Sequence, residues 1–363
     1  MIQASSTLLK ARLFRPTALI AFVVIFSSPA AALTMRFDNG GGDGLWETPA
    51  NWNEDTNPDT LPGAADVADI SNSHTASISS TQTITEVAIG WPNGAVATQS
   101  GVATLNVLAG TTLTTTTGTG MRVGRLLKGG QLLGSSQGRV FQSGGLVQIN
   151  GSTQGLRLSA GDSGNVADSY YRISGGRLLA TGASNAIQVG NLASNYVLSE
   201  FHVYGSGATE IRTDDFRIQD SPTGTTRLHM SLDAGGVTPI TANDEFQFRG
   251  TNNNELLIDL IGLAPTTDIT LVTADRLGNN SGAMENFFGL PQGSPISASF
   301  GPPSQQYTYN WTIDYLDASD NGILDAHIKL LFVSRTLSVP EPASFLLIGL
   351  GGVALALMRR RGC

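Results

Sequence analysis

Two acidic pairs in the middle of the chain have the residue types and the spacing of a carboxylate acid-base site. Asp214 and Asp215 are followed 30 residues later by Asp244 and Glu245, and Arg217 lies beside the first pair. In a fold that repeats with that period, the pairs would be neighbours, and two close carboxylates can divide acid and base roles. A solvated corner between strands explains the same residues, and no His-Gly or Arg-x-Lys motif accompanies them. We therefore predict no catalytic residue, with a carbohydrate-active lyase or hydrolase as the alternative.

Cysteine and histidine, the usual ligands of zinc, are few, with one Cys and four His. The single cysteine, Cys363, excludes a disulfide framework and a Cys-based zinc site. Residues 317–322 resemble the start of a calcium-binding EF-hand loop, but Ile328 stands where that loop needs Glu, so a hairpin turn is the simpler interpretation. His202 and His229 occupy equivalent positions in the repeat described next and could stack or hold a metal, but their spacing of 27 departs from the period. No metal site and no cofactor are predicted.

The elements that would position these residues recur along the chain. One series of apolar residues is separated by steps of 35, 31, 29 and 30, and it consists of Val123, Leu158, Val189, Ile218 and Phe248. A second series of alternating apolar and polar runs ends at glycine corners, and it covers residues 103–107, 139–142, 171–174, 201–204 and 228–231. Alternation places successive side chains on opposite faces of a strand.

Two series that keep phase over about thirty residues predict an all-β fold, a parallel β-helix with one coil per repeat. Each coil would bury its inward side chains against the coils above and below. An antiparallel β-sandwich also has a strand every ~8–12 residues, but it gives no reason for two phased series. The parallel β-helix is therefore the predicted fold.

The prediction divides the chain into five parts. They are a signal peptide (1–32), an N-terminal cap with the first strands (33–100), the β-helix repeats (101–254), C-terminal strands that cap the helix (255–336) and a sorting signal with a hydrophobic helix (337–363). Trp46 and Trp52 would cover the bare apolar end of the first coil, with sugar stacking as the alternative role. We expect strands at 307–315 and 323–331 to form a hairpin around Asp320-Asn321-Gly322.

The N-terminus has the layout of a secretory signal. Three basic residues precede an apolar run over residues 17–26, and small residues follow, including Ala30 and Ala32. We predict that signal peptidase cleaves after Ala32. An N-terminal membrane anchor is the alternative, but the apolar run is too short to span a bilayer. The exported chain is acidic, since the full chain already has a net charge of -8, and this argues against a nucleic-acid partner.

The C-terminus combines a prolyl motif, a short apolar segment and a basic end. The motif consists of Val339, Pro340, Glu341 and Pro342. The apolar segment covers residues 345–358, and the basic end consists of Arg359, Arg360 and Arg361. Because positive residues resist translocation, the pattern predicts a short membrane helix whose last residues are cytoplasmic.

These three features, in this order, resemble the PEP-CTERM protein-sorting signal, which is also called the ice-binding protein C-terminal domain. The resemblance covers about the last 25 residues and implies a Gram-negative bacterium. It also implies that an exosortase recognises Pro340-Glu341-Pro342 and removes the tail, after which the protein moves from the inner membrane to the envelope, outer surface or extracellular matrix. An ordinary tail anchor is the alternative. The segment around Trp46 and Trp52 is similar to the opening of secreted β-helix proteins with this tail.

Together these features predict an exported, non-enzymatic surface or matrix protein with a structural or adhesive role. Extracellular polysaccharide is its candidate partner, besides the processing enzymes and the transient membrane contact. Ice binding is not expected, because the threonines of residues 111–117 do not recur in later coils.

Overall fold

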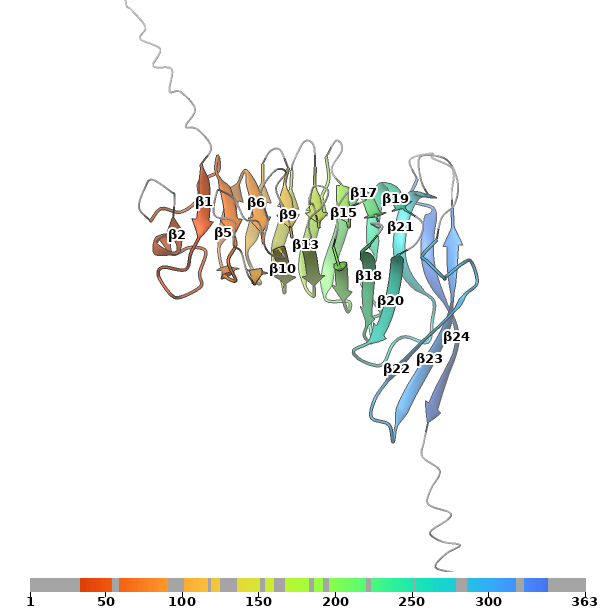
Figure 1. The fold of residues 1–363 in the computed structure, drawn as a ribbon. Helices are drawn as coiled ribbons and strands as arrows, with labels where there is room; N and C mark the ends of the chain where they lie inside the picture. The colour runs from red at the N-terminus through yellow and green to blue at the C-terminus, as the bar shows by residue number, and fades with distance from the viewer. Residues whose placement is uncertain are drawn as a thin grey trace, which may run out of the picture. The chain divides into compact units, whose positions relative to one another are not determined.

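A computed structural model describes the central part of the chain (Figure 1). The described residues are 33–53, 59–90, 101–116, 119–124, 136–150, 154–159, 167–182, 186–191, 196–219, 223–250, 253–278, 286–317 and 323–338. All described strands belong to one compact unit. The predicted signal peptide with Ala30 and Ala32, the sorting motif from Val339 and the terminal arginines lie outside the described residues.

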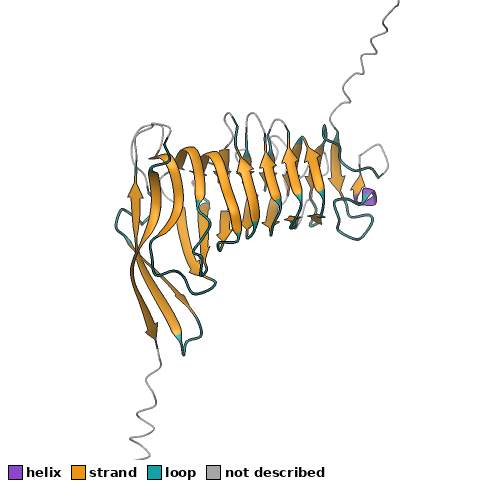
Figure 2. Ribbon diagram, turned by 180° about the vertical axis from the view of Figure 1, so that it is seen from behind, coloured by secondary structure: helices purple, strands orange, loops and turns teal. Residues whose placement is uncertain are grey.

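The chain forms a parallel β-solenoid of about six turns with about 31 residues per coil. Figures 1 and 2 show the strands stacked in chain order along the solenoid. The first ladder of parallel strands contains β4 (Thr75–Ile78), β7 (Val102–Val107), β10 (Ser136–Gln142), β13 (Ala167–Ile173), β16 (Leu198–Tyr204), β18 (Thr225–Leu232) and β20 (Asn254–Leu260).

Two further ladders complete each coil. The second contains β5 (Thr81–Ile84), β8 (Thr112–Thr115), β11 (Leu146–Ile149) and β14 (Gly176–Ala180). The third contains β1 (Thr34–Phe37), β3 (Val67–Ile70), β6 (Glu86–Ile89), β9 (Met121–Val123), β12 (Leu156–Leu158) and β15 (Ala186–Val189). Three longer strands then serve both ladders, namely β17 (Ala208–Gln219), β19 (Ile240–Arg249) and β21 (Ile269–Gly278).

The predicted apolar series is the inner column of the third ladder. Val123 pairs with Leu158, Leu158 with Val189, Val189 with Ile218, and Ile218 with Phe248. This register confirms the parallel β-helix and its phase. The ladders extend beyond the predicted repeat region in both directions, from β1 to β21. The spacing from β1 to β3 is 33 residues, but the coil from β3 to β6 departs from the period because Val67 pairs with Glu86, only 19 residues later.

The core consists of side chains that stack on their equivalents in the next coil. Tyr171 stacks on Phe201 with 5.5 Å between ring centroids. Phe216 stacks on Phe246 at 5.2 Å. All four rings are fully buried. Because each coil repeats the inward positions of the last, the apolar stack is continuous.

The corner after the third ladder requires a left-handed backbone. Gly124 and Gly190 have φ angles of 63° and 78° there, and Ser159 has 58° at the same position of its coil. A Cβ on Gly124 would lie 2.4 Å from the carbonyl oxygen of Asp168. Glycine therefore relieves both the backbone strain and the close approach of the next coil.

The N-terminal end is closed by a short 3-10 helix, η1 (Pro49–Asn51), and by β2 (Trp52–Asn53), which pairs antiparallel with β1. Trp46 and Trp52 lie in contact with 4.5 Å between ring centroids, and neither side chain is exposed. The Nε1 of Trp52 donates a hydrogen bond of 2.7 Å to the carbonyl oxygen of Trp46. These rings pack in the cap as predicted, and neither has a face open to a sugar.

The C-terminal end is closed by β22 (Pro295–Phe300), β23 (Gln306–Leu316) and β24 (Ala326–Ser338). β24 pairs antiparallel with β21 and with β23, which confirms the predicted hairpin strands, although Asp320-Asn321-Gly322 lies outside the described residues. Because Leu337 and Ser338 pair with Tyr307 and Gln306, the last strand continues into the segment that the sequence assigned to the sorting signal.

Candidate functional site on the outer face of the first ladder

The outer face of the first ladder changes character along the solenoid. Its outward side chains in β4 and β7 are small and polar, namely Thr75, Ser77, Thr104 and Asn106. The outward positions of β16, β18 and β20 include charged and aromatic side chains, namely Glu200, His202, Tyr204, Arg227, His229, Glu255 and Asp259, together with Ser231 and the exposed Leu257. Chemistry-bearing side chains therefore gather on one half of one face.

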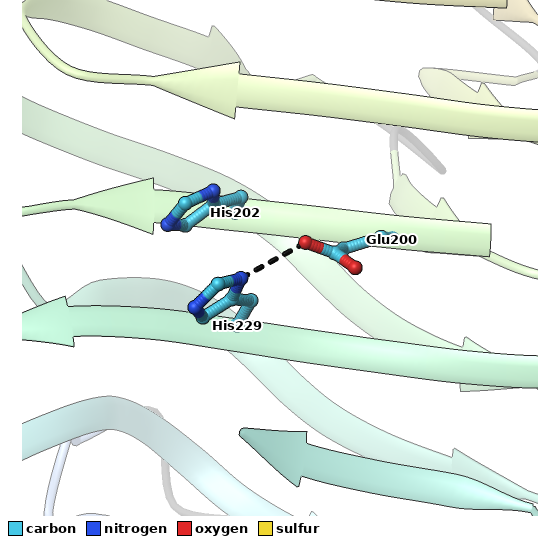
Figure 3. A group of neighbouring side chains, drawn as sticks. All are labelled: Glu200, His202 and His229. Carbon is cyan, nitrogen blue, oxygen red and sulfur yellow. Dashed lines mark hydrogen bonds and ion pairs between the residues drawn. The ribbon is translucent and has the colours of Figure 1, made fainter. Parts of the chain in front are cut away.

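Glu200, His202 and His229 form the centre of this group (Figure 3). His202 and His229 are register partners in β16 and β18, and their rings stack 3.7 Å apart at an interplanar angle of 4°. The Oε1 of Glu200 lies 2.9 Å from the Nδ1 of His229. The parallel register fixes the stacking, because it places equivalent outward positions directly above one another.

The two stacked imidazoles have opposite pKa shifts. Burial would lower the pKa of His229, but hydrogen bonds with Asp259 and Glu200 outweigh it and raise the pKa to about 9. Burial and the adjacent His229 charge lower the pKa of His202 to about 4. Burial would raise the pKa of Glu200, but His229 and Arg227 hold it below its ordinary value. At neutral pH the site therefore contains a neutral His202 beside a charged His229.

A chain of hydrogen bonds crosses the site and defines the tautomer of His202. Ser231 donates to Asp259, so the hydroxyl oxygen of Ser231 accepts from the Nε2 of His202, 2.7 Å away. The Nδ1 of His202 is then free to accept from the hydroxyl of Tyr170, also at 2.7 Å. This chain holds the Tyr170 ring in place.

The Glu200, His202 and His229 side chains offer three metal-ligating atoms within 4.8 Å of one another. Imidazole nitrogens bind a metal with lone pairs that lie in the ring plane, and one ion cannot lie in two parallel stacked planes. Each ring nitrogen also has a protein partner, because His229 contacts Glu200 and Asp259. The group is arranged as a hydrogen-bonded ionic network, and a metal would require one ring to turn.

A groove of about 420 Å³ lies beside this network, over β10, β13 and β16. Its lining includes Gln137, Arg139, Phe141, Asp168, Tyr170 and Glu200. Tyr170 and Glu200 belong to both the groove and the network. The groove therefore combines two aromatic rings, one exposed arginine and several oxygen acceptors on a rigid sheet.

The acidic residues singled out by the sequence lie elsewhere, at the corner between the second and third ladders. Asp215 and Glu245 are register partners there, as their spacing predicts. Asp215 is ion-paired with Arg217. Arg276 lies 3.4 Å from Glu245 and 3.6 Å from Asp244.

The remaining carboxylate of that corner, Asp214, accepts hydrogen bonds from the Gly182 backbone at 2.7 Å and from Asn243 at 3.2 Å. Burial, with the charges of Asp215 and Asp244, raises the pKa of Glu245. Each carboxylate thus has a partner within the fold. That none of these residues is catalytic stays a prediction.

Sequence reasoning placed His202 and His229 at equivalent positions but did not select Glu200, Tyr170 or Asp259. The spacing of 27 between the histidines is the local coil length, because Phe201 pairs with Leu228 over the same interval. The alternation of side chains along each strand could have identified these residues. A residue one position before or after an inward aromatic side chain or leucine points outward, and such residues of neighbouring coils share one face.

The fold and this face define a parallel β-solenoid with a grooved, network-bearing outer surface. The family model of the PEP-CTERM protein-sorting motif matches residues 338–361, so the chain carries that sorting motif at its C-terminus. The motif implies exosortase-dependent export to the cell surface. No curated protein matches the chain, and no solved structure matches it either.

Within the part of the chain that the structure describes, no helix is long and apolar enough to cross a membrane. The predicted membrane helix at residues 345–358 lies outside that part.

Proposed function

We propose that the protein is a non-enzymatic component of the cell surface or extracellular matrix, which acts by its rigid shape and by contacts to polysaccharide. The observation that carries the proposal is the position of the sorting motif. The motif begins at Ser338, where the last strand of the solenoid's C-terminal cap ends. A sorting signal attached directly to a capped solenoid suits a protein that is delivered whole to the outside.

Intact-mass measurement of the protein from envelope and medium fractions of its native host tests the delivery. We expect a mass that lacks residues 1–32 and the tail after about Pro342. Replacement of Pro340, Glu341 and Pro342 by alanine should leave the tail attached and the protein in the inner membrane. Replacement of Pro302 and Pro303, two exposed prolines in a turn, is the matched control and should leave processing unchanged.

The role outside the cell is tested by deleting the gene and measuring the polysaccharide and protein composition of the matrix. An unchanged matrix would overturn the proposed role. A carbohydrate-active lyase or hydrolase is the second candidate, since Asp215 and Glu245 are neighbours. An enzyme of this kind would release new reducing ends from at least one glycan of a panel, and Asp214→Ala or Asp215→Ala would abolish that release. Such activity would replace our proposal.

A further inference from the structure

The groove over β10, β13 and β16 has an aromatic wall. Phe141 and Tyr170 lie 5.6 Å apart between ring centroids, with planes tilted by 57°. The Tyr170 ring is fixed because its hydroxyl bonds to His202. Rigid aromatic rings of this kind cover the apolar C–H face of a sugar ring with little entropic cost.

Both carboxylates that line the groove have hydrogen-bond partners within the protein. Glu200 is bonded to His229 and to Arg227, at 2.9 and 3.1 Å. Asp168 accepts two backbone hydrogen bonds, from Val197 and Leu198. These contacts leave both carboxylates fixed in place.

Arg139 is exposed at the groove wall, directly beside Tyr170 in the register. Among the described residues, no carboxylate forms an ion pair with its guanidinium. A guanidinium presents parallel N–H donors that match a carboxylate with two hydrogen bonds. The groove thus has an anion-binding fork next to an aromatic wall, with Asp168 and Gln137 available to sugar hydroxyls.

We propose that this groove binds a uronic acid residue of an acidic polysaccharide. Arg139 takes the sugar carboxylate, and Phe141 and Tyr170 contact the ring face. The inference rests on the proposed function and names its ligand class. The chain has a net charge of -8, so its overall electrostatic potential does not attract a polyanion. Binding must come from this local site.

Affinity electrophoresis in native gels tests the proposal with polygalacturonate and, separately, with uncharged dextran. The protein is expressed from the full gene in its native host and recovered, as the host processes it, from envelope or medium. We expect polygalacturonate, but not dextran, to retard the wild type. Arg139→Gln should weaken polygalacturonate binding by about tenfold or more, since it removes a charge-assisted bidentate contact.

Arg335→Gln is the matched control. Arg335 is also an exposed arginine beside aromatic rings, with its guanidinium 5.5 Å from the Tyr307 ring centroid, but it lies on β24 outside the groove. Its replacement should leave retardation unchanged. Phe141→Ala should weaken binding without abolishing the preference for the acidic polymer.

Three results would overturn the proposal. They are no retardation of the wild type by polygalacturonate, equal retardation by dextran, and equal loss of binding in Arg139→Gln and Arg335→Gln. None of these results affects tail removal or matrix composition, so failure of this inference is distinguishable from failure of the proposed function.

Discussion

The two faces of the first ladder share strands and register but follow different rules. On β16, Phe201 points inward and is fully buried, while Glu200 and His202 on either side occupy outward positions, where the network keeps them 6% and 5% exposed. The inner column stays apolar from β7 to β18, with Leu105, Val140, Tyr171, Phe201 and Leu228 in register. The outer column next to it passes from Ser77 and Asn106 to the two histidines.

This difference indicates that the inner face builds the solenoid and the outer face is free to vary. A strand with simple polar outward residues, such as β7, pairs as regularly as β16. The ionic network is therefore an addition to the fold, and its energy should be separable from that of the core. Four predictions test this separation.

The largest effect is expected from Phe201→Ala. It removes a buried ring that stacks on Tyr171 and contacts Phe216 at 5.4 Å between centroids. We expect the free energy of unfolding to fall by about 3–5 kcal/mol, because the cavity cannot close in a stacked core. Urea unfolding followed by circular dichroism measures it. Phe141→Ala, the same change on the outer face, should cost much less; equal costs would refute the distinction between the faces.

The next effect is a pH dependence with two limbs. Folding raises the pKa of His229 from 6.5 to about 9, so its stabilisation is full below pH 6.5 and is lost as pH rises through 9. Folding lowers the pKa of His202 to about 4, so stability is lost as pH falls from 6.5 towards 4. Each limb amounts to roughly 3 kcal/mol.

Urea midpoints measured across that pH range should therefore pass through a maximum near neutrality. His229→Gln should flatten the alkaline limb and also shorten the acid limb, since the His229 charge helps to depress the pKa of His202. An alkaline limb that persists unchanged in His229→Gln would show that this histidine is not its source.

A smaller effect is expected from Glu200→Gln. The Glu200 side chain is 8% exposed and contacts both Arg227 and His229. The substitution removes one carboxylate from both cations, and we expect the free energy of unfolding to fall by about 1–3 kcal/mol at neutral pH. Glu255→Gln is the control, because Glu255 also pairs with Arg227 but is 45% exposed. It should cost below about 1 kcal/mol. Thermal unfolding at neutral pH compares the two variants.

The smallest effect is expected from Asn106→Ala on the plain half of the outer face. Asn106 donates one hydrogen bond of 3.1 Å to Ser77 and faces solvent in part. We expect a change within about 0.5 kcal/mol. A change as large as that of Glu200→Gln would show that the plain half also contributes to stability, contrary to the comparison.

The fold could be predicted because its core repeats. Val123, Leu158 and Val189 each fill the same inward position, and burial imposes that regularity on the sequence. The coil from β3 to β6 and the last strands could not be placed by period, because a 19-residue coil and an antiparallel cap carry no thirty-residue signal. Their alternation alone marks them as strands.

The site was harder to predict because outward positions need not repeat. His202 and His229 are register partners on neighbouring strands, and Arg172 precedes them in the same outer column. Tyr170 lies two residues before Arg172, so it belongs to the adjacent column, where it pairs with Glu200. The Glu200 carboxylate has no distinguishing motif, and its partners come from β18. Contacts between coils of unequal length become visible only once the inner register is known.

Both ends of the solenoid are closed by antiparallel strands, β2 against β1 and β24 against β21. Each of these strands occupies the sheet edge to which a further parallel coil would otherwise pair. The number of coils between them is therefore set by the sequence and not by addition of further chains. Each inserted coil would lengthen the solenoid by about 4.8 Å and leave both capped ends intact. The length of the protein can therefore change in steps of one coil.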